Sequence, residues 1–242
     1  MYSKPIIIAV EGNIGAGKST LLEKLNERFS NRKEPFRVLF MKEPVELWQS
    51  ITDKNGEDIL TKFYENTEKY SFAFQIMAYS TRLAKLKEAI KSSYDIIICE
   101  RSLEADRNVF AKMLADDGKI EDIMYTIYNR LYQDTSDEFQ MDGIVYLNTS
   151  PEVCQERIKI RHREGEDSIQ IDYLSQCQKY YEKWLIEGED LNKNTKILEL
   201  NCNASVTYNG DEGELWIEQI VNFAQSFVDK QNKEEWFHEK YT

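Results

Sequence analysis

Short apolar runs alternate with longer segments of helical periodicity along this chain. Short runs of residues that favour β-strands occupy residues 6–10, 37–41, 95–99, 143–147 and 196–200. Apolar positions that recur every three or four residues predict helices at residues 19–29, 67–92, 104–114, 120–133, 151–163, 173–187 and 214–230. Because strands alternate with helices, we expect an α/β fold, doubly wound around a five-stranded parallel sheet.

Nothing in the pattern divides the chain into separate domains. Its 242 residues with 41% hydrophobic content suffice for the core of one large α/β domain. No linker rich in Pro, Gly or Ser interrupts the chain, and no internal repeat is evident. We therefore expect a single domain over residues 1–242 with a polar C-terminal tail at about residues 231–242.

The first predicted strand leads directly into a phosphate-binding loop. The motif G-x-x-x-x-G-K-S stands between that strand and the first predicted helix, which is the context it requires. Its glycines let backbone N–H groups surround phosphate oxygens, and the helix N-terminus adds partial positive charge. Lys18 would reach the terminal phosphates of a nucleoside triphosphate. The residues of this predicted ATP site are Gly12, Asn13, Ile14, Gly15, Ala16, Gly17, Lys18, Ser19 and Thr20.

The next two predicted strands end in charged residues. Ligands of a parallel sheet bind beyond the carboxyl ends of its strands, so these residues are candidates for chemistry. Glu43 precedes Pro44, whose fixed φ stiffens the turn, and could accept a proton from a hydroxyl or be an ordinary surface acid. Glu100 and Arg101 stand where a carboxylate for Mg²⁺ and a cation for phosphate are expected, with Ser19 as a second Mg²⁺ ligand. On its own, this strand end is a weak signal.

The charge of the chain restricts its partners. A net charge of −12 argues against nucleic acid and anionic membranes, because both polyanions would be repelled. ATP is also an anion, so cations must gather where its phosphates bind. The dense basic segment at residues 157–163 is the candidate, although charge alone fits a solvated helix face equally well.

Cysteine spacing and the N-terminal sequence favour a cytoplasmic protein. Cys99, Cys154, Cys177 and Cys202 are widely separated and contain no C-x-x-C pair, so we expect reduced, mostly buried thiols. The N-terminal residues resemble neither a signal peptide nor an arginine-rich presequence. No segment approaches the roughly 20 apolar residues that span a bilayer.

Taken together, the motifs resemble the deoxynucleoside kinase family, most closely its deoxycytidine and deoxyguanosine kinases. The resemblance runs in consistent order from about residue 6 to residue 187 and rests on the phosphate loop, Glu43-Pro44-Val45 with Trp48, Phe74-Gln75, Glu100-Arg101-Ser102 with Asp106-Arg107, and residues 157–166. It implies a P-loop kinase fold with an arginine-rich lid at about residues 157–170, and a homodimer. It also implies transfer of the γ-phosphate of ATP to the 5′-hydroxyl of a deoxynucleoside.

The resemblance assigns roles to individual residues. Glu43 is similar to the general base of the family, and Arg101 to the residue that holds the 5′-hydroxyl and the transferring phosphate. Lys18 completes the implied catalytic group, and Ser19 and Glu100 would orient Mg²⁺. The lid arginines that would close over the ATP phosphates are Arg157, Arg161 and Arg163.

The resemblance also implies a nucleoside pocket of aromatic and polar side chains. Gln75 is similar to the glutamine that reads a nucleobase edge, because its amide offers one donor and one acceptor side by side. On pattern alone, Phe74 and Phe110 would be core residues. Tyr64 and Glu166 would reach the sugar 3′-hydroxyl, with Glu164 as the alternative carboxylate. The implied nucleoside-binding set is Glu43, Val45, Trp48, Tyr64, Phe74, Gln75, Ala78, Arg82, Arg101, Asp106, Phe110 and Glu166.

Three of these residues bear on the choice of substrate. Ala78, Arg82 and Asp106 fall where this family separates kinases for cytosine and purine nucleosides from those for thymidine. An aspartate beside the base accepts a hydrogen bond from an exocyclic amine, whereas thymine presents a carbonyl there. We expect deoxycytidine, deoxyadenosine or deoxyguanosine to be favoured over thymidine, unless Arg82 and Asp106 form an ordinary salt bridge.

Other functions stay open at this point. A nucleoside monophosphate kinase of the thymidylate kinase type shares the loop and lid, but its anionic acceptor should not require a base such as Glu43. A non-catalytic structural subunit would not need Lys18, Glu43 and the lid arginines together. A guanine-nucleotide switch is disfavoured because residues 192–195 lack the aspartate of N-K-x-D.

Overall fold

A computed structural model of the chain describes residues 4–31, 34–163, 165–204, 208 and 210–241. Its centre is a parallel sheet with the strand order β2-β3-β1-β4-β5. The strands are β1 (Ile6–Gly12), β2 (Val38–Met41), β3 (Ile96–Glu100), β4 (Gly143–Asn148) and β5 (Lys196–Asn201). Each begins and ends within two residues of the apolar run that predicts it. The expected α/β fold with a five-stranded parallel sheet is therefore confirmed.

Strand β1 lies in the middle of the sheet and is buried along its whole length. Val10 pairs with Glu100 of β3, and Gly12 pairs with Leu147 of β4. From β1 the chain first builds one side of the sheet and then returns to build the other. The order of strands thus reverses at β1, and the crevice beyond its carboxyl end is where ligands of such sheets bind.

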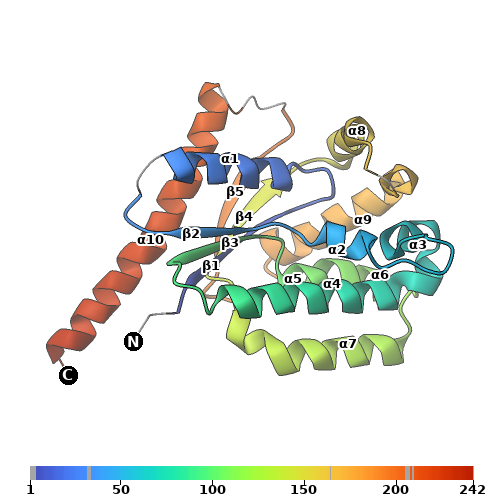
Figure 1. Ribbon diagram of the computed structural model, residues 1–242, viewed down its shortest axis with the longest axis horizontal. Helices are drawn as coiled ribbons and strands as arrows, with labels where there is room; N and C mark the ends of the chain where they lie inside the picture. The colour runs from blue at the N-terminus through green and yellow to red at the C-terminus, as the bar shows by residue number, and fades with distance from the viewer. Residues whose placement is uncertain (1–3, 32–33, 164, 205–207, 209, 242) are drawn as a thin grey trace.

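Helices cover both faces of the sheet (Figure 1). On one face lie α1 (Lys18–Asn31) and α10 (Asp211–Tyr241), and on the other lie α4 (Thr67–Ala89), α7 (Asp122–Thr135) and α9 (Ile171–Tyr181). The shorter helices are α2 (Val45–Gln49), α3 (Ile59–Glu65), α5 (Leu103–Ala105), α6 (Lys112–Asp116) and α8 (Pro151–Arg161). No helix of the described residues has the length and apolar character needed to cross a membrane.

Two predicted helices contain π-helical turns. The segment predicted at 104–114 forms α5, the π-helix η1 (Asp106–Ala111) and α6, and α9 continues into the π-helix η4 (Glu182–Ile186). Such turns insert a residue into the helix and frequently occur at functional sites. The remaining short elements are the 3₁₀ helices η2 (Ser136–Phe139) and η3 (Glu166–Ser168).

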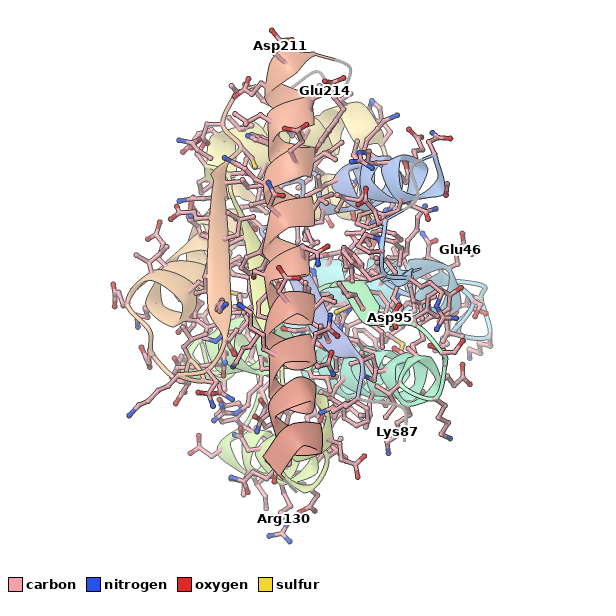
Figure 2. The ribbon with its side chains drawn as sticks, turned by 90° about the vertical axis from the view of Figure 1, so that its left-hand side faces the viewer. Glu46, Lys87, Asp95, Arg130, Asp211 and Glu214 are labelled. Atoms are coloured by element: carbon pink, nitrogen blue, oxygen red, sulfur yellow. The ribbon has the colours of Figure 1, made fainter. Side chains whose placement is uncertain are left out.

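Several predicted boundaries are wrong. Helix α8 ends at Arg161 rather than at residue 163, because His162 adopts a left-handed conformation with φ 47°. Helix α10 was expected to end at residue 230, but it continues to Tyr241 (Figure 2), so the predicted tail is largely helical. No proline or glycine follows residue 230 to stop it. Helices α2 and α3 were missed because five and seven residues are too few to show a period.

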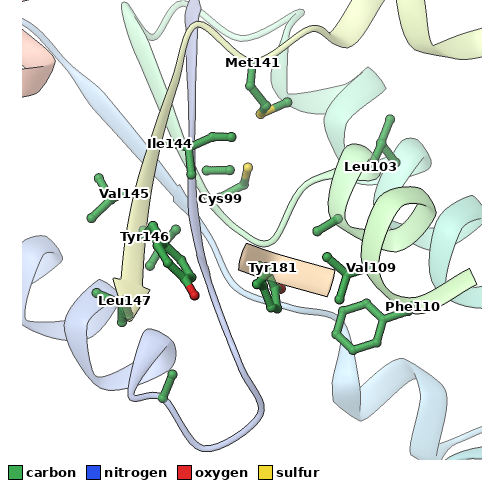
Figure 3. Packing of buried hydrophobic residues seen from close by; sticks show 14 of the residues in the cluster. Cys99, Leu103, Val109, Phe110, Met141, Ile144, Val145, Tyr146, Leu147 and Tyr181 are labelled. Atoms are coloured by element: carbon green, nitrogen blue, oxygen red, sulfur yellow. The ribbon is translucent and has the colours of Figure 1, made fainter. Parts of the chain in front are cut away.

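The apolar core is continuous between the sheet and both helix layers. Figure 3 shows Ile144, Val145 and Tyr146 of β4 near Tyr181, and Phe110 of η1 beyond it. On the other face, Gly143 allows α10 to approach the sheet closely, since a Cβ there would lie 2.8 Å from Cε1 of Phe223. All four cysteines are buried and unpaired, as the sequence predicts.

Candidate active site

A cavity of about 470 Å³ lies beyond the carboxyl ends of the central strands. It extends from the phosphate loop, past the ends of β2 and β3, to side chains of α2, α3 and α4. All the predicted site residues line it except Gly12, Asn13 and Ala16. Glu164 lies outside the described residues. Residues that are up to about 150 positions apart in the sequence therefore meet in one place.

The phosphate loop depends on its glycines. Gly12 has φ 142°, and a Cβ there would lie 2.7 Å from the carbonyl oxygen of Leu147. Gly15 has φ 83°, and its Cβ would collide with the carbonyl oxygen of Cys154. Asn13 points into the protein, where its amide donates to the carbonyl oxygen of Leu174 over 2.8 Å. Gly12 and Asn13 thus shape the loop from outside the cavity.

Lys18 is held against the loop that it follows. Its Nζ donates to the carbonyl oxygens of Gly12 at 3.0 Å and Asn13 at 2.7 Å, and the residue is only 5% exposed. Burial first, and then the charge of Arg101, lower the pKa of Lys18 to about 7. Negative phosphate groups in the cavity would favour the protonated form of this amine.

Ser19 and Glu100 meet at the junction of the loop and β3. The Ser19 hydroxyl donates to Oε1 of Glu100 over 2.6 Å, and Oε2 accepts from the backbone N–H of Glu43 at 3.4 Å. A hydroxyl and a carboxylate are the hard oxygen donors that Mg²⁺ prefers, usually with water and substrate phosphates as its other ligands. No group of three or more His, Cys, Asp and Glu that could hold a metal occurs among the described residues. The Ser19 hydroxyl and the Glu100 carboxylate fit a magnesium ion that also binds a nucleotide.

Glu43 lies between two arginines. Its Oε1 is 3.2 Å from Nε of Arg101 and accepts a hydrogen bond from Nη2 of Arg82 at 3.0 Å. Burial raises the pKa of Glu43, but the charges of Arg101, Arg82 and Lys18 together outweigh this and hold the pKa below its ordinary value. The carboxylate is therefore ionised at neutral pH and can accept a proton or a hydrogen bond.

Arg82 also joins Glu43 to Asp106. Its Nε and Nη2 donate to the two carboxylate oxygens of Asp106 over 2.9 Å and 3.3 Å, and its Nη1 donates to the carbonyl oxygen of Glu100. Both side chains are nearly excluded from solvent. Such a pair, with its donors satisfied, has a fixed geometry at the wall of the cavity.

The predicted lid arginines make two kinds of contact. Arg157 donates to the carbonyl oxygens of Ala16 and Cys202, so it links α8 to the phosphate loop. Arg161 and Arg163 both form ion pairs with Glu166, at the end of the segment. A Cβ at Gly165 would lie 2.8 Å from Oγ1 of Thr61, so this glycine lets the segment pack onto α3.

Aromatic rings form the far wall of the cavity. Phe63 stacks on Phe74 with 4.5 Å between ring centroids, and Trp48 meets Phe74 edge-on at 5.5 Å. Phe110 lies beneath the guanidinium of Arg101, 4.7 Å from the ring centroid. Because aromatic faces stack on any heterocyclic base, this wall can contact a flat ring.

Gln75 is the polar side chain within this aromatic wall. It is 2% exposed, yet it has no hydrogen-bond partner among the described residues and lines the cavity. A buried amide normally finds partners in the protein or in a ligand. Gln75 can therefore present one donor and one acceptor to a molecule in the cavity.

Several lining residues were missed from the sequence, namely Glu23, Leu60, Phe63, Ile160 and Tyr173. Leu60 and Phe63 belong to α3, which was not predicted. Its signal was Asp58, whose carboxylate caps the helix by accepting from the N–H groups of Leu60 and Thr61. For Ile160 and Tyr173 the sequence offers no signal, because apolar helix positions usually belong to the core.

Comparisons with known proteins agree with this geometry. A sequence model described as deoxynucleoside kinase matches residues 8–229. A probable deoxycytidine kinase of fowlpox virus (strain NVSL) is 36% identical over 219 residues, covering 89% of this chain and 87% of the viral protein. Deoxycytidine kinase of Homo sapiens is 32% identical over 245 residues, covering 89% and 90%. The mitochondrial deoxyguanosine kinase of Xenopus laevis is 29% identical over 246 residues, covering 91% and 89%.

Proposed function

We propose that this chain, which belongs to the deoxynucleoside kinase family, phosphorylates deoxycytidine or a purine deoxynucleoside in preference to thymidine. Membership confirms the resemblance inferred from the motifs and makes the chain an ATP-dependent nucleoside kinase. Its substrates are ATP and a nucleoside, which argues against a monophosphate kinase or a non-catalytic subunit. The names of the relatives, deoxycytidine kinase and deoxyguanosine kinase, support the proposed preference.

The observation that carries this preference is the buried pair of Arg82 and Asp106 in the cavity that Gln75 also lines. Asp106 lines the cavity and is oriented by two hydrogen bonds from Arg82. A carboxylate oxygen has more than one acceptor site, so it can also accept from the exocyclic amine of a base. Thymine would place a carbonyl oxygen against that carboxylate and leave both acceptors unpaired. The Gln75 amide, free of protein partners in the described chain, would read the neighbouring edge of the base.

The proposed reaction follows from the position of Glu43. The nucleoside 5′-hydroxyl oxygen attacks the γ-phosphorus of ATP, its proton passes to the Glu43 carboxylate, and the bond to the β–γ bridging oxygen breaks to release ADP. Arg101 lies 3.2 Å from Glu43, so its guanidinium can hold the same oxygen and the transferring phosphate. Lys18 and the lid arginines Arg161 and Arg163 would supply further charge at the phosphates.

We propose that Ser19 and Glu100 hold Mg²⁺ when ATP is bound. Both supply oxygen ligands, and Oγ of Ser19, at the start of α1, lies 2.6 Å from Oε1 of Glu100, at the end of β3. When bound, the ion would neutralise the negative charge of the phosphates during transfer. Glu166 and Tyr64 would bind the sugar 3′-hydroxyl. The Glu166 carboxylate would then contact this hydroxyl and the lid arginines Arg161 and Arg163 at the same time.

The resemblance further supports a homodimer packed through helices that include residues 67–92, which contain α4, and we propose that α7 completes the interface. The two helices lie side by side (Figure 1). Helix α7 exposes Ile123 and Ile127, one turn apart, with 68% and 54% of their surface accessible. Exposed apolar side chains on one helix face are typical of a protein contact. We also propose that the chain acts as a single domain in the cytoplasm, where its buried thiols would stay reduced.

Rates with the four deoxynucleosides and thymidine monophosphate test the proposal. We expect kcat/KM with ATP and Mg²⁺ to be highest for deoxycytidine or a purine deoxynucleoside, and lowest for thymidine among the nucleosides. Thymidine as the best acceptor would overturn the proposed preference. Faster transfer to thymidine monophosphate than to any nucleoside would contradict the nucleoside acceptor.

A further inference from the structure

Glu11 is a buried carboxylate to which the proposed reaction gives no role. It is the last residue before the phosphate loop, has 0% of its surface exposed and does not line the cavity. Its oxygens accept from the backbone N–H and the hydroxyl of Ser102, both at 2.7 Å, and from the hydroxyl of Tyr181 at 3.0 Å. Burial raises the pKa of Glu11, and the charge of Arg101 and the hydrogen bonds from Ser102 and Tyr181 offset only part of this cost.

Tyr181 connects this carboxylate to Arg101. Its hydroxyl donates to Glu11 and accepts a hydrogen bond from Nη1 of Arg101 at 2.5 Å. The ring is fixed between Tyr146, on which it stacks at 5.8 Å, and Phe110, which it meets edge-on at 6.4 Å (Figure 3). The π-helix η4 begins directly after Tyr181. The hydroxyl therefore has one position, from which it orients the guanidinium.

The backbone of Arg101 is strained and is held from both sides. Its φ of 65° lies in the left-handed region, which residues with a side chain rarely adopt. On its N-terminal side, the N–H of Arg101 donates to the carbonyl oxygen of Val10. On its C-terminal side, the next peptide N–H belongs to Ser102 and donates to Glu11. Glu11 thus binds the peptide N–H that follows Arg101, and it contacts the Arg101 side chain through the Tyr181 hydroxyl.

We propose that Glu11 is a positioning residue for phosphoryl transfer, which fixes Arg101 through the Ser102 peptide and the Tyr181 hydroxyl. The inference rests on the role given to Arg101 in the proposed function. Nη1 of Arg101 also donates to the carbonyl oxygen of Gly12 at 3.1 Å, so without Glu11 the guanidinium keeps its charge and this contact but is oriented less strictly toward Glu43 and the transferring phosphate. Orientation matters most in the transition state, so kcat should fall while KM for the nucleoside changes little.

Two variants test the connection. Glu11→Gln keeps the shape of the side chain but replaces one acceptor oxygen with an amide N–H₂. That donor would face the Ser102 or Tyr181 groups, which donate to the carboxylate in the wild type. Tyr181→Phe removes only the linking hydroxyl and keeps the ring packing, so it serves where Glu11→Gln folds poorly. We expect each to lower kcat about tenfold, as for a lost hydrogen bond to a charged group, with KM within about twofold. The matched control is Tyr146→Phe, whose buried hydroxyl contacts Gln178 and not Arg101.

The same changes in an Arg101→Ala background separate positioning from folding. If Glu11 acts through Arg101, then Glu11→Gln should lower kcat no further once Arg101 is absent. A full additional loss in that background would overturn the inference. So would wild-type kcat in both Glu11→Gln and Tyr181→Phe while Arg101→Ala is impaired. Undiminished kcat in Arg101→Ala itself would instead refute the role proposed for Arg101, and the inference with it.

Discussion

Arg82 donates two hydrogen bonds to the carboxylate of Asp106, from Nε at 2.9 Å and from Nη2 at 3.3 Å. The same Nη2 also donates to Glu43 at 3.0 Å. One guanidinium therefore joins the carboxylate proposed to read the base with the carboxylate proposed to accept the proton. If a different nucleobase displaced Asp106, Glu43 would also move, because one rigid guanidinium binds both carboxylates.

Asp106→Asn should relax the discrimination against thymidine. The amide keeps the size of the carboxylate but can donate a hydrogen bond to the thymine carbonyl. We expect kcat/KM for thymidine relative to deoxycytidine to rise about tenfold, measured in competition. Asp229→Asn, at an exposed position of α10, is the control. An unchanged ratio in Asp106→Asn would exclude this carboxylate from base selection.

Glu43→Gln should lower turnover and leave nucleoside binding nearly intact. Loss of a general base typically reduces a rate by about 10²- to 10⁴-fold, whereas the amide can still accept from Arg82 and Arg101. Single-turnover rates and nucleoside dissociation constants would separate the two effects. Glu46→Gln, an exposed glutamate of α2, should behave as the wild type. Wild-type turnover in Glu43→Gln would remove Glu43 from the mechanism.

The features that could be predicted are those whose cause is local. The buried strands β1, β3 and β4 need continuous apolar runs, and the edge strands β2 and β5 keep short runs of β-forming residues between helices, so all five could be placed from the sequence. The phosphate loop has a fixed spacing of glycines and Lys18. Glu43, Glu100 and Arg101 follow strands, and parallel strands bring their carboxyl ends to one edge of the sheet. Each of these rules needs only a few adjacent residues and a known topology.

The features that could not be predicted depend on packing between distant segments. Phe63 and Tyr173 have the apolar helix pattern of core residues, and only the folded chain shows that they line the cavity as well as contact the core. The π-turns at Asp106 and after Tyr181 leave no mark in the periodicity. Glu11 did leave a signal, because a charged residue ends an otherwise apolar buried strand.

The lowered pKa of Lys18 predicts that capture of ATP weakens above neutral pH. In the free enzyme this pKa is about 7, because burial and the charge of Arg101 disfavour the protonated amine. Since kcat/KM for ATP reports the free enzyme, it should fall between pH 7 and pH 9. Bound phosphates raise the pKa of the amine, so kcat at saturating ATP should stay level over the same range. A level kcat/KM for ATP up to pH 9 would contradict this prediction.

Glu100→Gln should raise the Mg²⁺ concentration needed for half-maximal activity. An amide oxygen carries no charge and is a weaker ligand for Mg²⁺ than a carboxylate. We expect an increase of about tenfold, measured by titrating Mg²⁺ at a fixed concentration of ATP. Glu23→Gln is the control, because Glu23 also lines the cavity but pairs with Lys42 at 2.7 Å. Equal Mg²⁺ requirements in Glu100→Gln and the wild type would place the ion elsewhere.

Ile127→Asp should dissociate the proposed homodimer. Ile127 lies in the exposed apolar row of α7, and a dimer would bury it against the partner, where an unpaired carboxylate is strongly unfavourable. Sedimentation velocity should show the wild type as a dimer and the variant as a monomer at micromolar concentration. The matched control is Leu215→Asp, since Leu215 is 53% exposed on α10, across the sheet from α7.

Because α7 packs on α4, which carries Gln75 and Arg82, a monomeric variant that keeps full activity would show that the site is complete within one chain. A variant that stays dimeric would place the interface on another surface.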